Sequence, residues 1–126
     1  KNHGTFLNNH RICAPQHTSG KLLSSIVLGE IGDKRLRLLP YKENVRSFGA
    51  ASLEMCLVAH GAIDCFMCLK KHLRVTDIAA ATLIVREANG VVKDMEGKPL
   101  DISCNVLEHT SVVAAINEEI ISRLLG

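Results

Sequence analysis

The sequence predicts an α/β fold in which a mixed, largely parallel sheet is flanked by helices. The first observation is that short, compact apolar stretches alternate with longer stretches whose apolar residues recur at helical spacing. The second is that Gly and Asn residues, which favour turns, separate these stretches. With 126 residues the chain fits one domain that buries about two-thirds of its unfolded surface. We therefore expect one compact core covered by helices.

The first elements are predicted to be a hairpin and a buried strand. Residues 5–7 and 10–12 flank Asn8 and Asn9, and Asn tolerates the positive φ angles of tight hairpin turns. Residues 24–28 then form a buried strand. The next segment, 29–42, is predicted to be an irregular, solvated edge, since its basic residues alternate with leucines.

A helix is predicted over residues 49–60, followed by a strand over 62–69. Ala50, Leu53 and Leu57 recur at helical spacing, and Gly61 is a suitable C-terminal stop. The segment 62–69 is compact, apolar and bounded by turn-forming residues, which indicates a strand.

The second half of the chain is predicted to contain two more helices. One covers residues 77–88, with Thr76 as its N-cap and Asn89-Gly90 as a left-handed end. A strand over 91–95 and a turn at Glu96-Gly97 follow. The last predicted helix covers 108–125, because its apolar residues form one stripe: Val112, Val113, Ile116, Ile120, Ile121 and Leu124.

Composition argues against several classes of partner. The 15 basic and 13 acidic residues give a formal charge of +2, far from the basic balance that nucleic-acid binding favours. The longest apolar stretches are shorter than the roughly 20 residues that span a bilayer. Five cysteines, an odd number at low density, suggest the reducing cytoplasm. The chain begins with Lys1 instead of Met, so we expect a piece of a longer protein.

Asp77 is the candidate metal ligand. It lies in the first turn of a predicted helix, where its carboxylate is held in place. One carboxylate is a poor site for Mg²⁺, which takes several oxygen ligands, so we expect Asp77 to be part of a larger site. The alternative is that Asp77 only complements the helix dipole.

A zinc or redox site is a second possibility, carried by Cys65, Cys68 and His72. The spacing supplies no fourth ligand. If 62–69 is a strand, the two cysteines point to opposite faces and do not chelate one ion. Residues 70–74 form a basic segment whose default interpretation is a solvated turn.

Five segments in order together resemble the inositol monophosphatase superfamily of Mg²⁺-dependent, lithium-sensitive sugar phosphatases, and the resemblance covers essentially the whole chain. They are GTFLNN at 4–9, RSFGAASLEM at 46–55, TDIAA at 76–80, VREANG at 85–90 and DMEGKPL at 94–100. The form with a long interval between Asp64 and Asp77 resembles archaeal members that accept both inositol phosphates and fructose 1,6-bisphosphate.

The resemblance implies a site with two or three Mg²⁺ ions that polarise a phosphate and activate water. Asp77 matches a metal-ligating aspartate of the family. Gly49 and Ala51 match positions that line the substrate, and Arg46 matches a position that orients the loop or contacts a second phosphate. Cys68 stands where many inositol phosphatases carry a substrate-contacting acid, which puts inositol as the preferred substrate in doubt.

The family's glutamate pair and its Asp-Pro-x-Asp-Gly-Thr motif are not found in the sequence. The resemblance therefore implies that residues 1–126 are a C-terminal domain and that an absent N-terminal domain supplies the other metal ligands. Glu118-Glu119 is more simply a solvated helix face.

The resulting hypothesis is an enzyme that hydrolyses inositol 1-phosphate, fructose 1,6-bisphosphate or both when full length, with this chain inactive alone. Family members are commonly dimers, and residues 4–12 are a candidate contact. The alternative is a non-catalytic α/β module that binds a partner or dimerises.

Overall fold

The computed structural model describes residues 2–17, 20–27, 44–101 and 105–126. Its strands are β1 (Thr5–Leu7), β2 (His10–Ile12), β3 (Leu23–Val27), β4 (Asn44–Arg46), β5 (Cys65–Leu73), β6 (Val91–Lys93) and β7 (Thr110–Ala115). Its helices are α1 (Ala51–His60), α2 (Val75–Glu87) and α3 (Glu118–Leu125).

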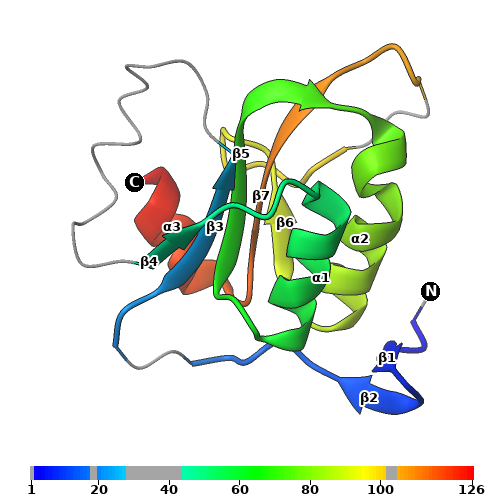
Figure 1. The fold of residues 1–126 in the computed structure, drawn as a ribbon, viewed down its shortest axis with the longest axis vertical. Coiled ribbons are helices and arrows are strands. Elements are labelled where there is room, and N and C mark those ends of the chain that lie inside the picture. The colour runs from blue at the N-terminus through cyan, green and yellow to red at the C-terminus, as the bar shows by residue number, and fades with distance from the viewer. Residues whose placement is uncertain (1, 18–19, 28–43, 102–104) are drawn as a thin grey trace.

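A five-stranded mixed sheet forms the centre, with strand order β4-β3-β5-β7-β6. The pairs β3–β4 and β3–β5 are parallel, whereas β5–β7 and β6–β7 are antiparallel. Helices α1 and α2 lie side by side on one face and α3 lies on the other (Figure 1). The predicted α/β fold with a mixed sheet flanked by helices is confirmed.

The core lies on both faces of the central strands. Phe66, Val112 and Ala114 are fully buried, and the strand register gives them the same face of the sheet. Val113 and Ala115 occupy the opposite face, towards α3. Because both faces are covered, β7 is buried from Ser111 onwards, and its residues 112–115 are all apolar rather than alternating.

The predicted hairpin is confirmed as β1–β2. Asn8 and Asn9 have φ angles of 50° and 65°, as its tight turn requires. The hairpin is tied to α2, because the Thr5 hydroxyl donates to the Ile84 carbonyl at 2.8 Å. The Glu87 carboxylate also accepts the backbone N–H of Gly4 at 3.0 Å.

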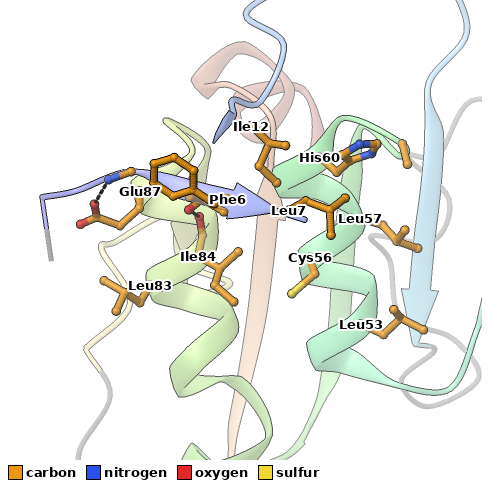
Figure 2. Close-up of a pocket in the computed structure, with 13 residues that line it drawn as sticks. Phe6, Leu7, Ile12, Leu53, Cys56, Leu57, His60, Leu83, Ile84 and Glu87 are labelled. Carbon is orange, nitrogen blue, oxygen red and sulfur yellow. Dashed lines mark hydrogen bonds between the residues drawn. The ribbon is translucent and has the colours of Figure 1, made fainter. Parts of the chain in front are cut away.

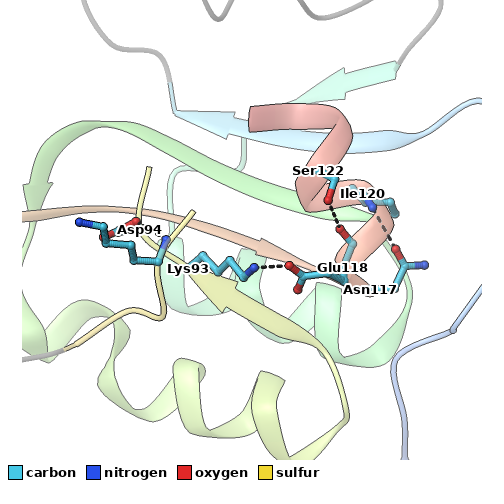
Figure 3. A network of polar contacts seen from close by, with 7 residues as sticks. Lys93, Asp94, Asn117, Glu118, Ile120 and Ser122 are labelled. Carbon is cyan, nitrogen blue, oxygen red and sulfur yellow. Dashed lines mark hydrogen bonds and ion pairs between the residues drawn. The ribbon is translucent and has the colours of Figure 1, made fainter. Parts of the chain in front are cut away.

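The predicted C-terminal helix over 108–125 is wrong in its first half, which is strand β7 followed by the shorter helix α3. The continuous apolar run that fits a helix stripe is the signature of a strand buried on both faces. Asn117 begins α3, since its side-chain oxygen accepts the Ile120 N–H at 3.0 Å. Glu118 is exposed and pairs with Lys93, in keeping with a solvated face (Figure 3).

The other predicted elements agree with the structure apart from their ends, whereas strand β4 was not predicted. Helix α1 begins at Ala51 instead of residue 49 and ends at His60, followed by the C-cap Gly61, whose φ is +78°. Helix α2 begins at Val75, so Thr76 lies inside it and is not its N-cap. Strand β5 starts three residues later than predicted and continues to Leu73. The prediction of a solvated turn over residues 70–74 is therefore wrong for residues 70–73, which are strand, although 70–72 are exposed as expected.

The segment 29–42, which was predicted to be irregular, lies outside the described residues, as do Leu28 and Cys104. Among the described helices, all are too short or too polar to cross a membrane.

Candidate functional site at the carboxyl edge of the parallel strands

One edge of the sheet collects the segments that the sequence singled out. Strands β4, β3 and β5 run parallel, so their carboxyl ends meet at this edge. Strand β7 runs the other way and starts there, because Thr110 pairs with Leu73. Segments 46–49, 74–77 and 105–109 therefore lie at the same edge, and α1 and α2 both begin there (Figure 1).

Helix α1 begins without a side-chain cap. Ala50 occupies the N-cap position and makes no side-chain hydrogen bond to the first turn. Gly49 precedes it with a φ of +79°, a conformation that L side chains rarely adopt. The N–H groups of the first turn are therefore not consumed by a cap, and a helix N-terminus in this state favours an anionic oxygen.

Glu54 fixes the approach to this helix, and the sequence reasoning missed it. Its carboxylate accepts the N–H groups of Phe48 and Ala50 at 3.0 and 3.2 Å. It also accepts the hydroxyl of Ser25, on β3, at 2.5 Å. The available signal was an acidic residue four positions after the N-cap in an otherwise apolar helix.

Cys68 lies on the same side of the sheet as Glu54. It is fully buried, and its Sγ is 3.3 Å from the Lys70 carbonyl and 3.7 Å from Nδ1 of His72. Burial, with a smaller contribution from the Glu54 carboxylate, raises the pKa of the Cys68 thiol to about 11. This position therefore presents a neutral thiol at pH 7 instead of a carboxylate.

Cys65 and Cys68 are both residues of β5 and lie three positions apart. Their side chains therefore point to opposite faces of the sheet. The two thiols do not bind one ion in this arrangement, which argues against the zinc alternative. Cys65 contacts the Ser24 hydroxyl at 3.1 Å on the α3 face.

Asp77 is exposed in the first turn of α2. Its Oδ2 accepts the backbone N–H of Arg74 at 2.8 Å, which caps the helix from inside the first turn. Its Oδ1 accepts no hydrogen bond from the residues that the structure describes. Asp77 therefore combines a fixed side chain with one oxygen free to bind a cation.

Arg46 is the last residue of β4, and its side chain is exposed at the same edge. Its guanidinium donates to the carbonyl of the neighbouring Val45 at 2.9 Å. Of the other predicted substrate positions, Gly49 lies in the loop before α1, Ala51 begins α1 and Cys68 lies on β5. The fold thus brings all the predicted site positions to one side of the molecule.

A separate groove of about 770 Å³ lies between the hairpin and the outer surfaces of α1 and α2 (Figure 2). Its walls are apolar, with Phe6, Leu53 and Leu83 about half exposed. Of its polar lining residues, Thr5 and Glu87 already bond to the backbone, which leaves the single imidazole of His60. The groove therefore offers little to a phosphorylated ligand, in contrast to the sheet edge.

The fold and the groups at this edge of the sheet define a class of protein. It is an α/β domain suited to an anionic ligand that binds beyond the carboxyl ends of its parallel strands. The model of the inositol monophosphatase family matches residues 1–125. The chain belongs to the inositol monophosphatase family.

Individual relatives agree with this assignment. The fructose-1,6-bisphosphatase of Pyrococcus furiosus is 36% identical over 123 residues, covering 98% of this chain and 47% of the relative. The fructose-1,6-bisphosphatase/inositol-1-monophosphatase of Thermococcus kodakarensis is 33% identical, covering 97% and 46%. The solved structure of a Pyrococcus horikoshii protein, described as similar to inositol-1 monophosphatase, superposes with a TM-score of 0.86 at 32% identity, covering 98% and 48%. The chain spans about half the length of the curated relatives it matches.

Proposed function

We propose that the whole protein hydrolyses the phosphomonoester of a small sugar phosphate, either inositol 1-phosphate, fructose 1,6-bisphosphate or both, with Mg²⁺ as cofactor. Family membership and the names of the two archaeal relatives support this substrate class. The observation that carries the proposal is the position of Asp77, whose free carboxylate oxygen lies at the same sheet edge as the uncapped start of α1.

The residues fit Mg²⁺ in part. A carboxylate oxygen held at a helix start is a ligand of the hard, anionic kind that Mg²⁺ prefers. The described residues contain no group of three His, Cys, Asp or Glu side chains that could hold a metal ion. Asp77 is thus proposed as one ligand of two or three ions whose other ligands come from the rest of the protein, the substrate and water. When bound, these ions would neutralise phosphate charge and lower the pKa of a water molecule.

The remaining residues are proposed to bind and orient the substrate. The backbone around Gly49 and Ala51 lies at the open start of α1, where N–H groups suit hydroxyl or phosphate oxygens. The Arg46 guanidinium is available to pair with a second phosphate, because its only described hydrogen bond is to an exposed carbonyl. Cys68 offers a substrate hydroxyl no charged acceptor, which favours a substrate other than one recognised through a carboxylate.

The whole protein is further proposed to be a cytoplasmic homodimer. Among the described cysteines, Cys13, Cys56 and Cys68 are free thiols, as a reducing compartment maintains them. The hairpin at residues 4–12 remains the candidate contact, because it exposes Phe6 and Leu7.

Substitution of Asp77 in the full-length protein tests the proposed function. Asp77→Asn keeps an oxygen that accepts the Arg74 N–H, so we expect a change in stability within about 0.5 kcal/mol. Loss of the anionic ligand should lower phosphate release from both sugar phosphates by more than about 100-fold. The measurements are phosphate release with and without Mg²⁺ and the free energy of unfolding.

Asp77→Ala is the matched control, since it removes the helix cap as well and should cost about 1 kcal/mol of stability. Turnover by Asp77→Asn equal to that of the unsubstituted enzyme would remove Asp77 from the metal site. An unsubstituted full-length protein that releases no phosphate from either substrate would favour the non-catalytic module.

A further inference from the structure

Glu54 is an acidic residue with no exposed surface. It lies one turn into α1, on the side of the helix that faces the sheet, where its neighbours Met55 and Val58 are also fully buried. A buried carboxylate is strongly unfavourable unless hydrogen bonds replace its hydration. Glu54 therefore occupies a place where an apolar residue would be easier to accommodate, and its hydrogen bonds indicate what it does there.

All three groups that donate hydrogen bonds to Glu54 lie in or beside the loop that leads from β4 into α1. One carboxylate oxygen accepts the N–H groups of both Phe48 and Ala50, the two residues that flank Gly49. The other oxygen accepts the hydroxyl of Ser25, on the strand that pairs with β4. The backbone on each side of the left-handed Gly49 is therefore tied to a single buried side chain.

This arrangement differs from an ordinary helix cap. A Ser, Thr or Asp at the N-cap position would accept an N–H of the first turn and remove it from contact with a ligand. Glu54 instead accepts the N–H of the N-cap residue Ala50 and of the loop before it. The start of α1 is thus held in place while its own first-turn N–H groups stay available.

We propose that Glu54 is a positioning residue for substrate binding: through Phe48 and Ala50 it holds the backbone of residues 48–51 in the conformation that meets the substrate. Where the substrate is concerned, this inference rests on the proposed function. The fixing of the loop itself rests only on the three hydrogen bonds and is tested separately.

The test uses substitutions at position 54 of the full-length protein. Glu54→Leu keeps the apolar volume and removes the acceptors, whereas Glu54→Gln keeps an oxygen for the two backbone N–H groups. Val58→Ala is the matched control, because it weakens the same helix in the core without touching the loop. Glu54→Asp, whose shorter side chain draws the carboxylate away from the loop, takes the place of Glu54→Leu if that variant does not fold.

The first readout is amide hydrogen exchange of a peptide covering residues 47–53, without substrate. We expect Glu54→Leu to speed exchange of the Phe48 and Ala50 amides about tenfold, with Glu54→Gln close to the unsubstituted protein. Val58→Ala, compared at an equal margin below its own unfolding midpoint, should leave these amides protected. Unchanged exchange in Glu54→Leu or Glu54→Asp would overturn the proposal, whether or not the protein is a phosphatase.

The second readout separates positioning from a merely structural role. We expect KM for the sugar phosphate to rise about tenfold in Glu54→Leu with a smaller change in kcat, and to be restored in Glu54→Gln. A rise in KM no larger than that of Val58→Ala would overturn the link to substrate binding. If the unsubstituted enzyme has no phosphatase activity, the proposed function fails, and the exchange readout still decides whether Glu54 fixes the loop.

Discussion

The chemistry of Cys68 is set by its surroundings more than by its identity. The side chain has no exposed surface, and its pKa is raised to about 11 by burial and, to a smaller extent, by the Glu54 carboxylate. A thiolate is the reactive form of cysteine, so this residue is expected to be chemically inert in the folded protein. Cys13, by contrast, is free and exposed.

We predict that iodoacetamide at pH 7.5 labels Cys13 at least about 100-fold faster than Cys68, whose thiolate fraction is roughly three in ten thousand. The measurement is quantitative mass spectrometry of the two peptides after timed quenching. In 6 M guanidinium chloride the two rates should become similar, which is the control. Comparable rates in the folded protein would contradict the burial of Cys68.

At the residue scale the sequence predicted the local structure around the candidate positions better than it predicted their hydrogen bonds. Asp77 was placed correctly in a first helical turn, but its partner is the N–H of Arg74 and Thr76 is not the cap. Glu54 went unnoticed, because hydrogen bonds from residues 48 and 50 and from Ser25, 29 positions earlier, depend on the tertiary fold. The roles of Gly49, Ala51, Arg46 and Cys68 in substrate binding remain predictions.

Among the elements, the β1–β2 hairpin depends on α2 for its attachment. Glu87, the last residue of α2, accepts the N–H groups of Asn2 at 2.6 Å and of Gly4 at 3.0 Å. These two hydrogen bonds lower the pKa of Glu87 below its ordinary value of 4.5, and the bond from Asn2 has the larger effect. A lowered pKa in the folded state means that the bonds stabilise the attachment above pH 4.5 and lose this effect as pH falls through the lowered pKa.

We therefore predict that the chemical shift of the Gly4 amide proton titrates with a midpoint below pH 4.5. The measurement is a series of NMR spectra between pH 6 and 2, and Glu87→Gln should abolish the titration. A midpoint at or above 4.5, or a titration that survives in the Gln variant, would show that Glu87 does not hold the hairpin.

Elements whose ends are marked by turn-forming or capping residues were predicted well. Elements whose structure depends on their neighbours in the sheet were not. The hairpin turn at Asn8 and Asn9 and the end of α1 at Gly61 follow from the conformational preferences of those residues. The pattern of apolar residues over 111–116 is compatible with a helix and with a buried strand. Only the position of this segment between β5 and β6 determines that it is a strand. Asn117 was the overlooked signal, since it marks the true start of α3.

For the molecule as a whole, the described residues bring together no group of three His, Cys, Asp or Glu side chains that could hold a metal ion. We predict that the purified 126-residue chain releases no phosphate above background from inositol 1-phosphate or fructose 1,6-bisphosphate at millimolar Mg²⁺. A phosphate-release assay with the full-length protein as positive control makes the comparison. Metal-dependent turnover by the chain, abolished by Asp77→Asn, would show that the site is complete without further residues.

The position of β7 also constrains how the protein can fold during synthesis. β7 lies between β5 and β6, although β6 precedes it in the chain. Among the described strands β6 pairs only with β7, so β6 has no neighbouring strand until residues 110–115 have left the ribosome. Until then β5 presents an open apolar edge, the kind of surface on which nascent chains pair with one another. A chain that stops before residue 110 would therefore leave β6 without its neighbouring strand and the edge of β5 open.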